Sequence, residues 1–234
     1  MRLIVNSDDY GLTRGVNLAI IEALNHGILR STTAMVNMPA IEHAAELSKL
    51  NPSLGVGLHL VLTAGKPIAA GHKTIVDENG DFLKGSVLMK KEDVDTEEVY
   101  TEYKAQMERF IQIFGRKPTH IDGHHHSHTL PTTRDAALRL AKDYGIEYVR
   151  HLTTDTVFIH DFYNDKVSVD DVISMLEANK EAKQVELMVH VAFIDVALMK
   201  ISSYNLKRME ELQTLTCPKV LDYVQNNGIE LTHF

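Results

Sequence analysis

Short runs of aliphatic and β-branched residues alternate along this chain with longer segments in which apolar residues recur three and four positions apart. The short runs predict strands and the longer segments predict amphipathic helices. Strands are expected at residues 3–6, 32–36, 56–60, 119–122, 148–151, 186–190 and 229–232. Helices are expected over 16–25, ending at Gly27, over 97–114, ending at Gly115, and from a cap at Ser168 through Leu176.

The alternation of strands and helices is typical of βαβ units around a parallel sheet. About seven such repeats suit a closed or slightly open barrel better than an open doubly wound sheet, although spacing alone is compatible with both. A chain of 234 residues needs no second domain to bury a core. We therefore expect a single α/β domain over residues 1–234, arranged as a TIM-like barrel.

Residues 65–95 interrupt this rhythm, with Gly71, Gly80 and Gly85 placed among charged residues. The segment is long for a connector between a strand and a helix. It is expected to form either a lid or substrate wall at the strand ends, or a disordered excursion.

Ligand-type side chains recur where the expected strands end. Asp8 and Asp9 follow the first strand, and His59, His124 and His190 lie at the ends of later ones. Taken singly, each aspartate could cap a turn and each histidine could be a satisfied core residue. In a barrel, however, the carboxyl ends of the strands converge on one face, so the coincidence predicts a shared site.

The chemistry of these residues indicates a catalytic metal. Residues 119–128 hold five of the thirteen histidines, and one aspartate with two imidazoles makes a set of three ligands that leaves positions open for water and substrate. A metal there would acidify a water and polarise a carbonyl, while a neighbouring carboxylate takes the proton. The predicted reaction is hydrolysis of an amide or ester, with a second histidine protonating the departing amine.

The composition of the chain narrows the range of molecules that it could bind. The net charge of −8, without clustered lysines, argues against nucleic acid or an anionic membrane and favours a small substrate. The single cysteine, Cys217, excludes a disulfide framework and a cysteine-based zinc site, and is expected to be a packing residue. The chain shows no signal peptide pattern and no apolar run long enough to span a bilayer, so a cytoplasmic protein is expected.

Four segments in order, residues 5–12, 57–67, 118–128 and 190–195, resemble the YdjC-like carbohydrate deacetylases, the family of the chitooligosaccharide deacetylases. The resemblance covers essentially the whole chain. It implies a deformed TIM-like barrel, and a homodimer that acts on acetylated amino sugars or short oligosaccharides.

The resemblance also implies roles for particular residues. A divalent metal, Mg²⁺ or Zn²⁺, would be held by Asp9, His59 and His124, and Asp8 would occupy the position of the general base. His190 is then the candidate general acid. The sequence departs from the family pattern at two positions, Val191, where proline is common, and Ser7, where alanine is common. Neither departure removes a ligand.

The remaining polar and aromatic residues of these segments are expected to support the site or the core. His125 is expected to point away from the metal, and His126 and His128 to orient ligands or touch substrate. Arg150 has two interpretations. It could orient Asp8 or bind substrate, or it could simply form a salt bridge on the barrel rim. Two aromatic side chains have two interpretations, stacking on a sugar or packing in the core: Tyr10 and Phe193.

Two other functions remain open. The spacing of His124 and His126 also occurs in metal-dependent hydrolases of the amidohydrolase or phosphoesterase type, but in those families the His-x-His pair follows the first strand, where this chain has Asp8 and Asp9. A non-catalytic sugar-binding protein could keep the fold without the reaction. The presence of all the expected catalytic and metal-binding residues favours the deacetylase.

Overall fold

The computed structural model describes residues 1–234 and contains one sheet of seven parallel strands. The strands lie in the order β4-β3-β2-β1-β6-β5, with β7 paired to the beginning of β1. Their bounds are β1 Arg2–Tyr10, β2 Ser31–Ala34, β3 Gly55–Leu60, β4 Ile121–Gly123, β5 Val157–Ile159, β6 Gln184–Val189 and β7 Glu230–Thr232.

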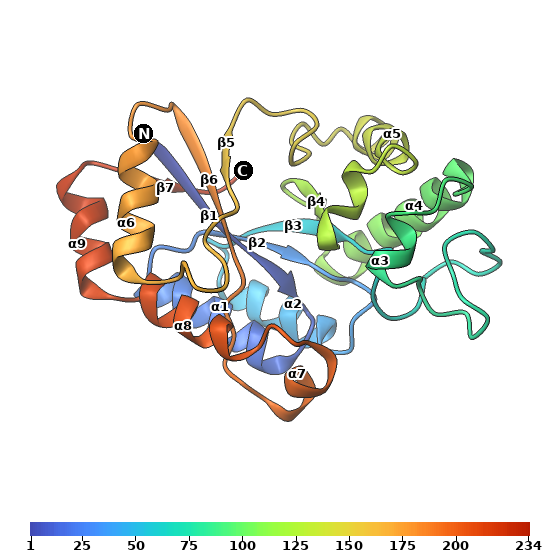
Figure 1. Ribbon diagram of the computed structural model, residues 1–234, viewed down its shortest axis with the longest axis horizontal. Coiled ribbons are helices and arrows are strands. Elements are labelled where there is room, and N and C mark those ends of the chain that lie inside the picture. The colour runs from blue at the N-terminus through green and yellow to red at the C-terminus, as the bar shows by residue number, and fades with distance from the viewer.

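Helices cover the outside of the curled sheet (Figure 1). They are α1 Arg14–His26, α2 Ile41–Leu50, α3 Gly85–Leu88, α4 Thr96–Phe114, α5 Arg134–Tyr144, α6 Val169–Ala178, α7 Val196–Ile201, α8 Leu206–Leu215 and α9 Pro218–Asn226, with a 3-10 segment, η1, at His124–Thr129. Helices α4 and α5 pack together beside β4, while α6 and α9 pack together at the other end. Because β4 and β5 end the strand order without pairing to each other, the barrel is open there, and the expected deformed TIM-like barrel is confirmed.

The local signals for the helices also hold. The Thr13 side chain accepts a hydrogen bond from the amide of Val16 at the start of α1. Ser168 and Asp171 form a reciprocal capping box at the start of α6. Gly115 ends α4 with φ of 69°, in the left-handed region that glycine enters without steric cost.

The expected strand at residues 148–151 is wrong. The segment makes one isolated parallel bridge, between Val149 and Ile121, through hydrogen bonds of the Tyr148 carbonyl and the Arg150 amide to Ile121. The chain then turns, with the Thr153 amide bonded to the Val149 carbonyl. The next strand along the chain, β5, pairs with β6 at the other edge of the sheet, and its Val-Phe-Ile run is too short to stand out from its polar neighbours. The positive φ of His151, 66°, marks where the chain departs from extended geometry.

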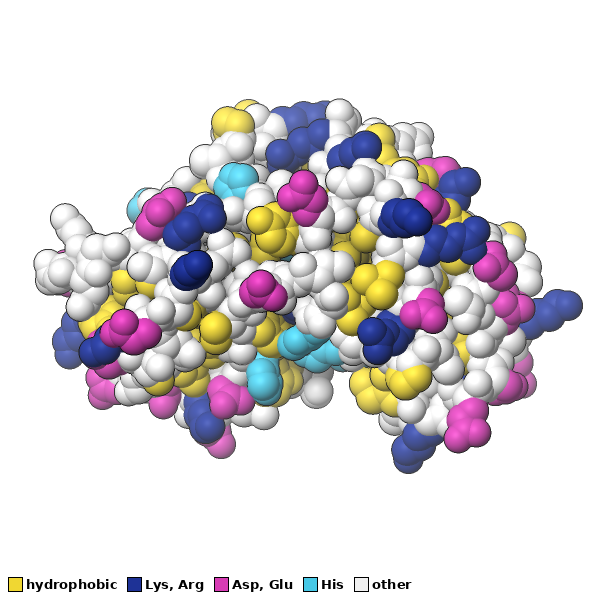
Figure 2. All heavy atoms as spheres, turned by 90° about the horizontal axis from the view of Figure 1, so that it is seen from above, with side chains coloured by type: hydrophobic (Ala, Val, Ile, Leu, Met, Phe, Trp, Pro, Cys, Tyr) yellow, Lys and Arg dark blue, Asp and Glu magenta, His cyan; other side chains and the backbone are white.

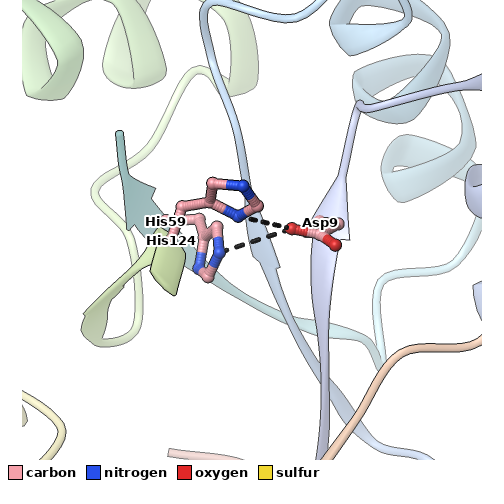
Figure 3. Close-up of side chains that lie close together, drawn as sticks. All are labelled: Asp9, His59 and His124. Carbon is pink, nitrogen blue, oxygen red and sulfur yellow. Dashed lines mark hydrogen bonds and ion pairs between the residues drawn. The ribbon is translucent and has the colours of Figure 1, made fainter. Parts of the chain in front are cut away.

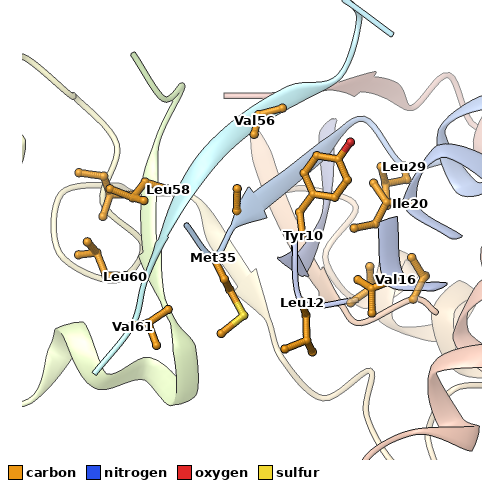
Figure 4. Packing of buried hydrophobic residues seen from close by; sticks show 14 of the residues in the cluster. Tyr10, Leu12, Val16, Ile20, Leu29, Met35, Val56, Leu58, Leu60 and Val61 are labelled. Carbon is orange, nitrogen blue, oxygen red and sulfur yellow. The ribbon is translucent and has the colours of Figure 1, made fainter. Parts of the chain in front are cut away.

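Strand β1 occupies the centre of the molecule, paired to β2, β6 and β7. Its side chains are buried on both faces, and complete burial of one aliphatic residue such as Leu3 or Val5 contributes about 1.5–3 kcal/mol. Tyr10, at its end, packs among Ile20, Leu29 and Val56 (Figure 4). The Asp8–Asp9 pair therefore lies on the buried central strand of the sheet.

Residues 65–95 are folded against α4 in the structure. The Glu102 carboxylate accepts hydrogen bonds from the amides of Ile68 and Ala69, and Glu98 accepts from the amides of Lys73 and Thr74. The segment also contains α3 and one antiparallel bridge. Its role as a lid stays a prediction.

No helix of the protein combines the length and apolar character that crossing a membrane requires.

Candidate active site

A bulge in β1 brings two adjacent carboxylates to the same place. Between Ser7 and Tyr10 the register with β2 shifts by one residue, and Asp9 has φ of 72°. In a regular strand, neighbouring side chains point to opposite faces. The bulge instead allows Asp8 and Asp9, both buried, to line one cavity at the carboxyl end of the sheet.

Asp9 faces His59, which lies on β3, and His124, which begins η1 directly after β4 (Figure 3). Its Oδ1 atom lies 3.1 Å from Nδ1 of His124, and 3.5 Å from Nε2 of His59. The three donor atoms lie within 4.8 Å of one another. His59 Nδ1 is hydrogen-bonded to Asp122 at 2.7 Å, an arrangement that fixes the ring and leaves Nε2 directed at Asp9. One carboxylate and two imidazoles oriented in this way fit a divalent cation.

The charges around Asp9 favour an ionised carboxylate. Burial alone would raise the pKa of Asp9, but Arg208 and His124 outweigh burial and hold the pKa well below its ordinary value. For His59, burial lowers the pKa, but the carboxylates of Asp122, Asp8 and Asp9 raise it to about 10. A cation bound at Nε2 would take the place of the proton that these carboxylates hold on the ring.

Arg208 was missed by the sequence reasoning. Its Nη2 atom donates to Asp9 Oδ2 at 2.7 Å, which leaves Oδ1 as the oxygen that faces the histidines. Arg208 lies on α8, and Leu212 and Leu215 of the same helix are buried with it. The available signal was the spacing of Arg208, Leu212 and Leu215, which places the arginine on the apolar face of a helix. A guanidinium buried on such a face requires a carboxylate partner.

Asp8 is held by a buried arginine. Arg150 donates to both of its oxygens, at 3.0 and 2.9 Å, and also contacts Asp122 and Glu186 at 2.9 and 2.8 Å. Burial would raise the pKa of Asp8, but Arg150, followed by His59 and His190, lowers it far below its ordinary value. The carboxylate is therefore ionised and fixed in orientation.

This arrangement corrects the plainer expectation for Arg150, a salt bridge on the barrel rim. The Arg150 side chain is almost fully buried. The backbone carbonyl of Arg150 accepts a hydrogen bond from Nε2 of His128 at 3.0 Å. Asp8, His59 and Asp122 also have donor atoms close enough to hold an ion. The guanidinium of Arg150 already supplies the positive charge between those two aspartates, so the Asp9 set is the better metal site.

His190 follows β6 and lies beside Asp8, with Nε2 of the histidine 4.0 Å from Oδ2 of the aspartate. Burial lowers the pKa of His190 to about 4, and Arg208 adds to this effect, while Asp8 opposes it. The two departures from the family pattern meet here, because the Val191 amide donates to the Ser7 hydroxyl at 3.3 Å. A proline would lack that donor and an alanine that acceptor, so the Ser7–Val191 hydrogen bond fixes the backbone next to His190.

A cavity of about 1080 Å³ connects these groups to solvent. Figure 2 shows histidine side chains in the hollow between two lobes of this face. Its lining includes Gly65, Lys66 and Met38, and also the aromatic residues Tyr163 and Tyr204. The volume suits a ligand larger than a simple amide.

A model of the YdjC-like protein family matches residues 2–226. The chain belongs to the YdjC-like family. A carbohydrate deacetylase from Clostridium beijerinckii is 40% identical over 100% of this chain and 99% of its own length. A carbohydrate deacetylase from Geobacillus stearothermophilus is 43% identical over 97% of this chain and 94% of its own.

Solved structures agree with this membership. A crystal structure from Enterococcus faecalis, provisionally named a cellobiose-phosphate cleavage protein, superimposes with a TM-score of 0.92 at 33% identity, covering 99% of this chain and 97% of that one. A polysaccharide deacetylase from Bacillus cereus has a TM-score of 0.56 at 14% identity, covering 100% and 91%. The second similarity shows that the YdjC-like fold is shared with a more distant group of proteins.

The other expectations for this YdjC-like chain have mixed outcomes. His125 bonds to Thr63 at 3.0 Å rather than to Asp9, and both His125 and His126 line the cavity. Tyr10 belongs to the core, with its hydroxyl donating to the Ala44 carbonyl at 2.7 Å. Phe193 is exposed and does not line the cavity, so neither of the two aromatic residues is placed to stack on a sugar.

Proposed function

We propose that this protein is a metal-dependent deacetylase that hydrolyses the acetamido group of N-acetylated amino sugars or short oligosaccharides. The observation that carries the proposal is the convergence of Asp9, His59 and His124 on one point, with the ionised Asp8 beside them in an open cavity. Relatives of about this length that are named carbohydrate deacetylases support it.

Asp9, His59 and His124 would hold the cation, which we propose to be Mg²⁺ or Zn²⁺. A divalent cation supplies Lewis acidity, which polarises the acyl carbonyl and makes the attacking water more acidic. Arg208 fixes the second oxygen of Asp9, so one oxygen of that carboxylate remains directed at the histidines. The protein's own contribution is therefore a rigid and charge-balanced set of ligands.

Asp8 accepts the proton of the attacking water. Arg150 holds this carboxylate in place through two hydrogen bonds, and the low pKa keeps it ionised before reaction. Attack of the water oxygen on the carbonyl carbon and cleavage of the C–N bond give acetate and the free amine. The amine is a poor leaving group unless it gains a proton as the bond breaks.

His190 supplies that proton to the nitrogen. Its lowered pKa, about 4, makes the ring neutral near pH 7 in the free protein. A neutral ring can take up the proton that Asp8 has accepted once the 4.0 Å between Nε2 and Oδ2 shortens to hydrogen-bond distance or a water bridges it. The same proton then passes to the departing amine, and the site returns to its starting state.

The rival hydrolase classes receive less support from the site. The ligand geometry is built on the Asp8–Asp9 pair of β1, whereas His126 does not join His59 and His124 around Asp9. A non-catalytic sugar-binding protein would have no need for an ionised carboxylate held beside the metal ligands. The geometry therefore favours a hydrolytic site.

The proposal is tested by measuring acetate release after reconstitution with each of several divalent metals. The substrates are N-acetylglucosamine, its short oligomers and their phosphorylated forms. Metal-dependent acetate release from at least one of them is expected. Absence of release from all of them, with metal bound in stoichiometric amount, contradicts the proposed function.

The homodimer that the family resemblance implies is also proposed. Apolar side chains on and beside α7 and α8 are exposed, among them Val196, Ile201 and Leu206, and such a patch is suited to an interface. Light scattering on the purified protein gives the mass in solution, and a monomeric mass contradicts this assignment.

A further inference from the structure

We propose that Tyr163 is the platform on which the sugar ring bearing the acetamido group stacks. This inference rests on the proposed deacetylase function and identifies how the carbohydrate part of the substrate is bound. Tyr163 lies outside every motif that the sequence analysis singled out. Its side chain is 38% exposed, and it lines the same cavity as Asp8 and Asp9.

The Tyr163 ring is held in a fixed orientation by a second tyrosine. It stacks on Tyr204 with ring centroids 4.1 Å apart and planes inclined by 20°. The Tyr204 hydroxyl donates to the buried Glu211, and it accepts a hydrogen bond from the Asn164 amide at 3.3 Å. Because Tyr204 covers one face of Tyr163, the exposed area of the ring belongs to the other face and the edge. Such a surface is available to a ligand without rearrangement.

The chemistry of an acetamide determines on which side of the site the sugar must lie. The acyl carbon carries only a methyl group, and the nitrogen carries the sugar. The group that protonates the nitrogen therefore marks the sugar side. His190 is that group in the proposed mechanism, and the rings of both Tyr163 and Tyr204 lie 5.9 Å from its ring. A sugar attached to the nitrogen would meet this aromatic wall.

A tyrosine at this position suits a pyranose ring. The C–H bonds of a pyranose face present weakly positive hydrogens to the negative face of an aromatic ring. The Tyr163 hydroxyl makes no hydrogen bond within the protein, so it is free to pair with a sugar hydroxyl. Ser202 and Ser203, which precede Tyr204 in the chain, add polar groups to the lining of the same cavity. The expected ligand is thus a cyclic amino sugar rather than a linear acetamide.

The test compares two substrates in variants at two aromatic positions. The substrates are a short N-acetylglucosamine oligomer and 4-nitrophenyl acetate, which has no sugar. Tyr163→Ala should raise KM for the oligomer about tenfold, and leave hydrolysis of the ester within about twofold of wild type. Tyr163→Phe keeps the ring and should restore most of the affinity. Phe193→Ala is the matched control, because Phe193 is 40% exposed and lies outside the cavity.

Each outcome decides the assignment. An unchanged KM for the oligomer in Tyr163→Ala overturns it, and so do equal losses on oligomer and ester, which indicate distortion of the site. If wild type releases no acetate from any sugar, the deacetylase proposal fails, and calorimetric titration with the oligomer then tests the platform alone. Binding that weakens in Tyr163→Ala supports the platform, and no binding to wild type overturns it as well.

Discussion

At the scale of single residues, His59 offers the clearest test of the metal site because its two ring nitrogens have different partners. Nδ1 is bonded to Asp122, and Nε2 faces Asp9. His59→Ala should therefore remove a ligand while leaving the carboxylates in place, so metal content and activity should fall together. Elemental analysis of the purified variant measures the first quantity. His26→Ala, which removes an exposed histidine, is the control, and full metal content in His59→Ala rules out the assignment.

Asp8 can be tested separately from the metal. Asp8→Asn keeps the size of the side chain and removes its basicity, and Arg150 retains Asp122 and Glu186 as partners, so the fold should persist. Turnover of an acetylated sugar should fall by about two to four orders of magnitude with the metal still bound. Asp93→Asn, at an exposed aspartate, should have no such effect. Turnover close to that of wild type would place the base elsewhere.

His190 is expected to act on the leaving group. An amide requires protonation of its nitrogen far more than an activated aryl ester requires protonation of its phenolate. His190→Ala should therefore severely impair acetate release from an acetylated sugar, while sparing much of the hydrolysis of 4-nitrophenyl acetate. Steady-state rates on both substrates are the measurement. Equal losses on the two would indicate carbonyl polarisation, and no loss on either would leave His190 without a catalytic part.

At the scale of elements, the sequence predicted where the ligands come from, but not how the strand ends are shaped. The positions of polar residues at strand ends predicted a shared site, the resemblance to the YdjC-like family singled out Asp9, His59 and His124 within it, and the structure brings these three together. The β1 bulge was not foreseen, because a positive φ at an aspartate leaves no pattern in a single sequence. That bulge is what allows Asp8 to lie beside Asp9.

The contacts that cross between elements were the least predictable. Arg208 on α8 pairs with Asp9 on β1 across most of the chain length, and neither residue indicates the other along the sequence. The Tyr163–Tyr204 pair joins two connecting segments that have no regular periodicity. The strand expected at residues 148–151 failed for a related reason. The Arg150 side chain at its end is buried against Asp8 and Asp122, and the chain leaves extended geometry at the next residue, His151.

At the scale of the whole molecule, buried acids couple the site to the stability of the fold. Burial raises the pKa of Glu211 to about 8, although the His190 amide, the Tyr204 hydroxyl and Arg208 oppose the shift. Glu186, buried beside Arg150, has its pKa raised to about 7. A raised pKa means that the native state holds the proton more tightly than the unfolded state. The stability from each acid is fully present below its ordinary pKa and is lost as pH rises through the raised value.

Glu211→Gln should therefore flatten the loss of stability between pH 6 and 8. A carboxyl group that is protonated in the native state and ionised in the unfolded state changes the free energy of unfolding by up to about 1.4 kcal/mol per pH unit. The glutamine side chain of the variant cannot titrate, so the variant lacks this contribution. Denaturant unfolding of the metal-free proteins at pH 6, 7 and 8 measures the slope. Histidines with lowered pKa values, such as His190 and His128, give the opposite slope below about pH 6.5, but they are common to both proteins.

Glu210→Gln is the matched control for this measurement, because Glu210 is the neighbouring carboxylate on α8 and is half exposed. Its unfolding free energy should follow the wild-type dependence on pH. The Glu211→Gln protein should instead lose less stability than wild type from pH 6 to pH 8. Parallel slopes for wild type and Glu211→Gln would mean that Glu211 is already ionised at pH 6. The hydrogen bonds from the His190 amide and the Tyr204 hydroxyl would then stabilise the carboxylate more strongly than burial destabilises it.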